Sequence, residues 1–234
     1  MRICGFNKST LLDYPGKVAA GLFLGGCNFR CPFCQNGGLV LHSADQPDIP
    51  VEEVLSVLKK RQGILDGVCV SGGEPTCSPD LAAFLEKIKE LGYPVKLDTN
   101  GSHPDMVKSL YEKGLIDKVA MDIKAAPEHY GTVAGLSGDA RPVVEAVRET
   151  AAFLMESGIE YEFRTTVVKE LHTEEDFVRI GEWLSGAKTY FLQVYRDSAE
   201  VIKRGFSPCS EKEMQAYARI LEKTIQNVEI RGMD

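Results

Sequence analysis

Short apolar runs alternate with longer segments of helical periodicity along most of the chain. The apolar runs predict strands at residues 17–25, 67–71, 94–98, 118–123, 161–168 and 190–194, with a last short strand at 228–231. Between them, apolar residues recur at intervals of three and four. This pattern predicts helices over residues 51–62, 80–91, 103–114, 141–157, 174–185 and 211–225, and a looser stretch at 125–140. Strands that alternate with helices are typical of parallel βαβ units.

This order predicts a single α/β domain over residues 1–234, built as an incomplete (β/α)6 barrel with residues 1–16 as an N-terminal extension. A complete eight-unit barrel typically takes roughly 250 residues. The chain is too short for that plus its extension, so we expect an open side bordered by residues 13–17 and 193–196. Active-site residues of such sheets lie at the carboxyl ends of the strands. The core is expected to include Phe84, Phe153 and Phe177.

Composition narrows the classes of partner. The formal net charge is −7, whereas proteins that bind nucleic acid usually carry a basic face. Protein or small-molecule partners are therefore favoured over nucleic acid. No apolar run of the sequence approaches the roughly 18–20 residues that cross a bilayer, and no signal peptide is recognisable. We expect a cytoplasmic protein with no membrane partner.

Three of the seven cysteines, Cys27, Cys31 and Cys34, stand within eight residues, directly after the first apolar run. Three thiolates can hold three irons of a cubane cluster and leave the fourth iron open. A structural zinc site normally takes four protein ligands, and His42 and the other cysteines stand at no matching spacing. The spacing favours a [4Fe–4S] cluster, with zinc binding or buried unreactive thiols as alternatives. Cys77 is expected to be a packed thiol.

Glycine and charged residues stand at the ends of the next three strands. Gly72-Gly73-Glu74 follows the second, Asp98-Thr99 marks the end of the third, and Asp122 with Lys124 marks the end of the fourth. Glycines let a backbone approach a ligand closely, and a carboxylate beyond them can accept from an ammonium group. Two carboxylates aimed at one place repel unless a cation lies between them. Each motif alone also fits a turn or a surface ion pair.

Arg164 and the histidines have less specific surroundings. Arg164 fits a cofactor carboxylate or a structural ion pair equally well, because a guanidinium matches carboxylate geometry. The four histidines fall in predicted loops or helix ends and are expected to be solvated: His42, His103, His129 and His172.

The C-x₃-C-x₂-C spacing, with Phe33 before the last cysteine, resembles the signature of the radical S-adenosylmethionine superfamily. Gly72-Gly73-Glu74, one βα unit later, is similar to that superfamily's motif for the methionine amine. The resemblance implies that S-adenosylmethionine chelates the open iron and that an electron from the cluster breaks its sulfonium C–S bond, giving methionine and a 5′-deoxyadenosyl radical. It implies no catalytic residue beyond the cluster ligands.

Residues 8–124 resemble a narrower group, the glycyl radical enzyme-activating enzymes, and among them the anaerobic ribonucleoside-triphosphate reductase-activating proteins. The shared features are L-D-Y-P-G-K at 12–17, G-C-N-F-R-C-P-F-C at 26–34, D-T-N-G at 98–101 and D-I-K at 122–124. The resemblance implies cofactor contacts from Asn36 and Lys124, and a monovalent cation held by Asp98, Thr99 and Asp122.

Some positions depart from that group's pattern. Gln35 stands where the activating enzymes typically have His, and the sixth strand carries Gln193, Tyr195 and Arg196 where a His is expected. No role is assigned to these residues.

The resemblance implies an enzyme that abstracts the α-hydrogen of a glycine in a partner glycyl radical enzyme, most specifically an anaerobic ribonucleoside-triphosphate reductase. It also implies an electron donor such as flavodoxin or ferredoxin. One alternative is a radical enzyme acting on a small molecule or RNA, for example a deazaguanine-forming synthase. Another is a non-catalytic iron–sulfur electron carrier or a zinc-binding module, which would leave the strand-end motifs unexplained.

Overall fold

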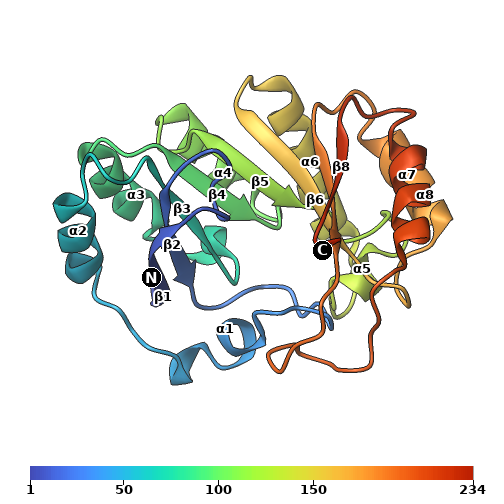
Figure 1. The fold of residues 1–234 in the computed structure, drawn as a ribbon, viewed down its shortest axis with the longest axis horizontal. Helices are drawn as coiled ribbons and strands as arrows, with labels where there is room; N and C mark the ends of the chain where they lie inside the picture. Colours follow the sequence, from blue (N-terminus) through green and yellow to red (C-terminus); the bar gives the residue numbers. More distant parts are fainter. Residues whose placement is uncertain (234) are drawn as a thin grey trace. The chain divides into compact units, whose positions relative to one another are not determined.

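The computed structural model describes residues 1–233 (Figure 1), and these residues form two compact units. The first holds residues 1–28, 36–99 and 103–120, and the second holds residues 29–35, 100–102 and those from 121 onward. Strand order in the sheet follows the chain from β1 to β8, with β5 (Lys118–Asp122) passing from one unit to the other. The predicted α/β class with an unclosed, largely parallel sheet is confirmed. The single-domain organisation stays a prediction.

The first unit is built on parallel strands β2 (Ala19–Leu24), β3 (Gly67–Gly72) and β4 (Val95–Thr99). Parallel strands covered on both faces read as continuous apolar runs, and most residues of β2 and β3 are buried. Its helices are α1 (Gly37–Leu41), α2 (Val51–Lys60), α3 (Leu81–Glu90) and α4 (Pro104–Glu112). Gly92, which follows the C-cap residue Leu91 of α3, has φ +85, a left-handed conformation that commonly ends a helix.

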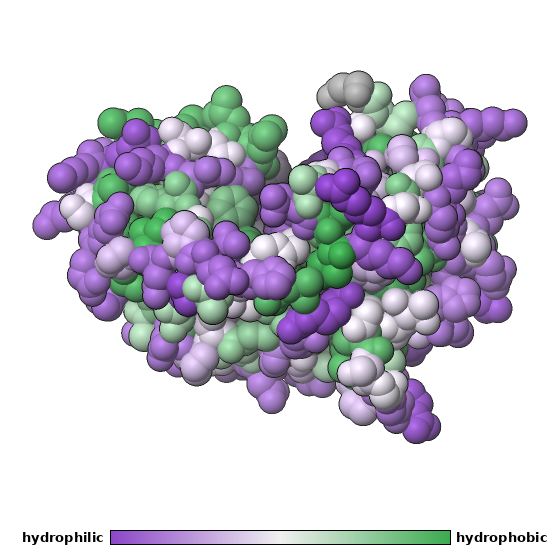
Figure 2. Space-filling view, turned by 90° about the horizontal axis from the view of Figure 1, so that it is seen from below, coloured by the Kyte–Doolittle hydropathy of each residue, from purple (hydrophilic) through white to green (hydrophobic). Residues whose placement is uncertain are grey.

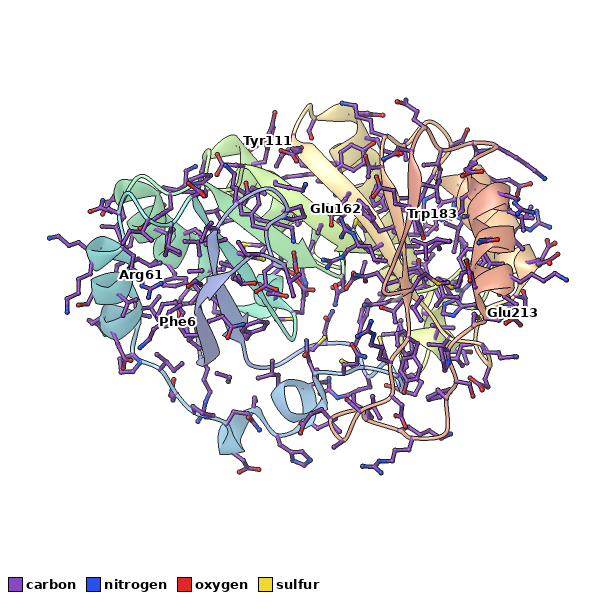
Figure 3. The ribbon with its side chains drawn as sticks, viewed as in Figure 1. Phe6, Arg61, Tyr111, Glu162, Trp183 and Glu213 are labelled. Atoms are coloured by element: carbon purple, nitrogen blue, oxygen red, sulfur yellow. The ribbon has the colours of Figure 1, made fainter. Side chains whose placement is uncertain are left out.

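The N-terminal extension contains a strand that the sequence pattern does not reveal. β1 (Ile3–Thr10) pairs antiparallel with β2. Its second half, Asn7-Lys8-Ser9-Thr10, is polar and largely exposed, so the apolar run that marks the other strands is absent there. Arg61, labelled in Figure 3, fastens this half by donating from Nη1 to the Lys8 carbonyl at 3.0 Å and to Ser9 Oγ at 3.2 Å.

The second unit holds β6 (Glu160–Val167), β7 (Tyr190–Val194) and β8 (Val228–Arg231), all parallel. Its helices are α5 (Tyr130–Val133), α6 (Arg141–Glu156), α7 (Glu174–Trp183) and α8 (Glu211–Leu221). Capping boxes start α7 at Thr173 and α8 at Ser210, each pairing an N-cap hydroxyl with an acidic residue three positions on. The short helix α5 lies within the stretch predicted to be loose.

Burial confirms part of the predicted core and corrects three expectations. Phe84 and Phe177 are buried, but Phe153 is only half-buried because it lies beside the buried stripe of α6 rather than on it. Cys77 is exposed rather than packed. His172 is buried rather than solvated.

The surface view in Figure 2 is mainly hydrophilic with smaller apolar patches. Within the described residues, no helix has the length and apolar character needed to cross a membrane. Large exposed apolar side chains are Leu11, Leu12, Leu41, Ile64 and Met233.

Candidate functional site

The glycines of Gly72-Gly73-Glu74 allow two stretches of protein backbone to approach each other. Gly73 N–H donates to the Leu24 carbonyl at 2.8 Å, and Glu74 N–H donates to the Gly26 carbonyl at 2.8 Å. A Cβ added to Gly73 would lie 1.9 Å from the Gly26 oxygen. The segment therefore fixes the backbone directly before Cys27. Close packing of the backbone therefore requires glycine here, in addition to the predicted approach of the glycines to a cofactor.

The Glu74 carboxylate is buried, with an exposure of 1%, and joins the ends of two strands. Its Oε1 accepts from Thr76 N–H at 3.0 Å, Thr76 Oγ1 at 2.5 Å and Thr99 Oγ1 at 2.8 Å. Charge-assisted hydrogen bonds of this kind hold a carboxylate in one orientation. Glu74 is thereby preorganised at the carboxyl ends of β3 and β4.

Asn36 also lies against this edge of the first unit. Its Nδ2 donates to the Gly72 carbonyl at 2.8 Å. Asn36, two positions after Cys34, is thus tied back to the glycine segment. Asn36, Gly72, Gly73, Glu74 and Thr99 are brought together as the strand order predicts.

Asp98 lies in the same unit and is paired with a lysine that the sequence reasoning overlooked. Lys96 Nζ makes an ion pair and hydrogen bond with Asp98 Oδ1, and Ser71 Oγ donates to Asp98 Oδ2 at 3.1 Å. Residues i and i+2 of a strand share one face, so the spacing V-K-L-D already places both side chains together. Lys96 is among the most buried residues of the unit.

In the second unit, Cys31 and Cys34 belong to one turn, closed by Cys34 N–H donating to the Cys31 carbonyl at 3.0 Å. The Cys31 thiol lies 3.6 Å from the Ala134 carbonyl. Gly135 has φ +63, and a Cβ there would lie 2.0 Å from the Arg30 carbonyl oxygen. Close backbone packing therefore holds this turn, and its two thiols are suited to ligate a metal cluster.

The residues after β7 support the other side of the cysteine turn. Gln35 Nε2 donates to the Arg196 carbonyl at 2.6 Å, Ile202 N–H donates to the Cys34 carbonyl at 3.2 Å, and Lys203 N–H donates to the Pro32 carbonyl at 2.8 Å. Gln35 thus anchors the turn on the very segment for which the sequence suggests no role. Nothing in the sequence links these two places, because the link runs through a backbone carbonyl.

Phe33 is buried, with an exposure of 5%, and its ring packs in a T-shaped arrangement with the His172 ring at a centroid distance of 6.4 Å. His172 Nδ1 accepts from Val168 N–H at 3.0 Å, and Nε2 lies 2.8 Å from the Lys124 carbonyl. These partners assign the proton to Nε2. Burial lowers the pKa of His172, so the neutral imidazole is a structural link between Val168 and Lys124.

Asp122 forms ion pairs with two basic side chains of the second unit. Arg164 Nε donates to its Oδ1 at 3.0 Å, and Lys124 Nζ donates to its Oδ2 at 3.0 Å. Burial alone would raise the pKa of Asp122, but attraction to Arg164 and Lys124 outweighs it and lowers that pKa to about 2. Burial opposes the charge of Lys124 too, yet Asp122 raises the pKa of Lys124. Arg164 is therefore an ion-pair partner in this structure.

The predicted cluster ligands divide between the units, Cys27 with the first and Cys31 and Cys34 with the second. Within residues 1–233, no three Cys, His, Asp or Glu side chains stand together as a preformed metal site. Ligation of a cluster by the three thiolates stays a prediction, as does the cation at Asp98, Thr99 and Asp122.

Comparison with known families decides the class of the chain. The model of the family described as "Radical SAM superfamily" matches residues 22–184. The chain belongs to the radical SAM superfamily. It is therefore a radical SAM enzyme, and membership implies a [4Fe–4S] cluster and S-adenosylmethionine. The resemblance stated from the cysteine and glycine motifs is confirmed.

Proteins with similar sequences include activating enzymes and a small-molecule synthase. The chain is 30% identical to a protein of Methanocaldococcus jannaschii provisionally named a glycyl-radical enzyme activating enzyme, over 99% of this chain and 96% of that protein. It is 29% identical to the pyruvate formate-lyase-activating enzyme of Streptococcus mutans, over 80% of this chain and 74% of the relative. A 7-carboxy-7-deazaguanine synthase of Methanopyrus kandleri is 30% identical over 50% of this chain and 52% of its own length.

Among solved structures, SuiB of Streptococcus suis bound to S-adenosylmethionine is similar with a TM-score of 0.66 and 15% identity. The likeness covers 90% of this chain and 51% of SuiB. At that identity it supports the fold alone.

Proposed function

We propose that this radical SAM enzyme generates a glycyl radical on a partner enzyme, with an anaerobic ribonucleoside-triphosphate reductase as the first partner to test. The observation that carries the proposal is the extent of the likeness to the activating-enzyme relative of M. jannaschii, which runs over 99% of this chain and 96% of that protein. The L-D-Y-P-G-K, D-T-N-G and D-I-K motifs point to the same group.

The cysteine turn and the strand ends supply the binding groups of this proposal. Cys27, Cys31 and Cys34 hold the [4Fe–4S] cluster, and the closed turn of Cys31 and Cys34 suits that role. When bound, the cluster and S-adenosylmethionine supply the species that abstracts hydrogen. The residues proposed to bind S-adenosylmethionine are Phe33, Asn36, Gly72, Gly73, Glu74, Asp98, Asp122, Lys124 and Arg164.

The chain's own residues orient the cofactor and need not transfer a proton. Glu74 is locked by donors on Oε1 and presents a carboxylate to the methionine amine. Lys124, held by Asp122 at 3.0 Å, keeps its positive charge and can face an anionic group of the cofactor. Hydrogen abstraction from glycine requires no general base, in keeping with a His172 that is used structurally.

The resemblance to activating enzymes also suggests where the enzyme acts and which electron donor it uses. The enzyme acts in the cytoplasm and takes an electron from a donor such as flavodoxin or ferredoxin. The likeness to 7-carboxy-7-deazaguanine synthase supports the small-molecule alternative, but over 50% of this chain rather than its full length.

Electron paramagnetic resonance tests the proposal. The anaerobically reconstituted enzyme, S-adenosylmethionine and a reductant are mixed with the reductase of the same organism. A doublet of a glycyl radical should appear on the reductase and be absent with the Cys34→Ala variant. The proposal would be overturned if the enzyme produced 5′-deoxyadenosine but the doublet appeared on no glycyl radical enzyme of the organism.

A further inference from the structure

The buried pair Lys96–Asp98 in the first unit changes the electrostatics expected at the end of β4. The Lys96 side chain is 2% exposed and the Asp98 side chain 16% exposed. Burying an unpaired ammonium is very unfavourable, whereas a pair with good geometry and further hydrogen bonds is tolerated. Lys96 Nζ meets Asp98 Oδ1, and Cys69 Sγ lies 3.8 Å from the same ammonium.

The second oxygen of Asp98 is also engaged by the protein. Ser71 Oγ donates to Oδ2 at 3.1 Å, so one oxygen faces an ammonium and the other faces a hydroxyl. The charge of Asp98 is therefore balanced by a residue of its own strand. Asp122, in the second unit, is balanced separately by Arg164 and Lys124.

The sequence alone predicts a monovalent metal ion at these carboxylates, because two like charges aimed at one place repel. The cationic partners remove that requirement. An ammonium group and a potassium ion carry the same charge and are similar in size, so one can stand in for the other beside a carboxylate.

We propose that the Lys96 ammonium is the built-in cation of Asp98, and that this enzyme binds and cleaves S-adenosylmethionine without a monovalent metal ion. The inference rests on the proposed function only in placing S-adenosylmethionine beside Asp98. It does not depend on the identity of the partner. Lys96 is a positioning residue in this account, since it acts through Asp98.

Equilibrium dialysis with rubidium ions tests the inference on the full-length, cluster-loaded protein. Wild type should bind no rubidium saturably. Lys96→Met removes the ammonium but keeps an unbranched side chain, and it should gain one saturable site per chain. The double variant Lys96→Met/Asp98→Asn should lose that site again. Lys89→Met is the matched control, because Lys89 pairs with Asp117 at the surface, and it should behave as wild type.

Cofactor cleavage gives a second measurement. Wild type should form 5′-deoxyadenosine at the same rate in potassium chloride and in tetramethylammonium chloride. In Lys96→Met, potassium should raise that rate at least about tenfold, since it neutralises the Asp98 carboxylate that has lost its ammonium partner.

Saturable rubidium binding by wild type, or a wild-type rate that requires potassium, would overturn the inference even if Lys96→Met does not fold. A folded Lys96→Met that gains no site would overturn it too. An enzyme that cleaves its cofactor without potassium but forms no glycyl radical would leave the inference standing and remove the proposed function.

Discussion

Thr99 Oγ1 donates to Glu74 Oε1 at 2.8 Å, so that two buried side chains join the carboxyl ends of β3 and β4. Thr99→Val removes this donor without changing the shape of the side chain. A hydrogen bond to a charged group contributes about 1.5–3 kcal/mol, and the free energy of unfolding should decrease by about that amount. Thr99→Ser keeps the hydroxyl and should lose less than half as much. Anaerobic urea denaturation makes the comparison, and equal losses in both variants would show that the hydrogen bond is not the cause.

Gly73→Ala should lower the free energy of unfolding more than Gly92→Ala, a substitution at a glycine with positive φ but open surroundings. Its Cβ would lie 1.9 Å from the Gly26 carbonyl oxygen, so backbone must move. Such overpacking typically costs about 1–3 kcal/mol or more. Gly92 has φ +85 with nothing within 4 Å of its added Cβ, and Gly92→Ala should cost about 1–2 kcal/mol from the left-handed backbone alone.

Because the backbone that Gly73 contacts leads into Cys27, Gly73→Ala should also lower the iron content after reconstitution. Iron and sulfide analysis of both variants measures this. Full iron content in Gly73→Ala would mean that the close approach does not position the cysteine segment.

Most of this architecture can be predicted from the sequence because its signals are local. The apolar runs at β7 and β8 have the bounds predicted, and the carboxyl-end placement brings Glu74 and Thr99 together. β1 is missed because its second half is polar and its pairing with β2 is a long-range property. The burial of His172 is missed for a similar reason, since its partners are a neighbouring amide and a distant carbonyl.

Lys96 is not among the predicted site residues, although the sequence contains a signal for it. A charged residue in the apolar run 94–98, two positions before Asp98, already indicates a pair on one face of the strand. The link between Gln35 and the Arg196 carbonyl has no such signal, because a backbone oxygen carries no identity in the sequence.

His172 should make stability depend on pH. Burial lowers its pKa in the folded protein, so the unfolded chain binds a proton near the ordinary value of about 6.5 while the folded protein does not. The contribution of neutral His172 to the free energy of unfolding is fully present above that pH. It is lost as the pH falls toward the lower pKa of the folded protein. Between pH 7 and 5, His172→Gln should show a shallower loss of unfolding free energy than wild type.

The exposed His42 provides the control for this titration. His42→Gln should keep the wild-type slope. Urea denaturation at several pH values measures it, and identical slopes in wild type and His172→Gln would exclude the buried imidazole as the source.

The three cysteines of the motif should be required for the cluster, and the others should not. Cys27→Ala, Cys31→Ala and Cys34→Ala should each lose the iron–sulfur absorbance and cofactor cleavage after anaerobic reconstitution, because an open-iron cubane needs all three thiolates. Cys77→Ala, at an exposed position, should retain both. Loss of the cluster in Cys77→Ala would require a different ligand set.

Transfer of deuterium from glycine tests the central claim most directly. A partner glycyl radical enzyme, or a peptide copying its glycyl loop, is prepared with deuterium at the glycine α-carbon and incubated with the reduced enzyme and S-adenosylmethionine. Mass spectrometry of 5′-deoxyadenosine should show one deuterium gained from that position. The account is contradicted if no glycyl radical enzyme or peptide transfers its label while a labelled small metabolite does.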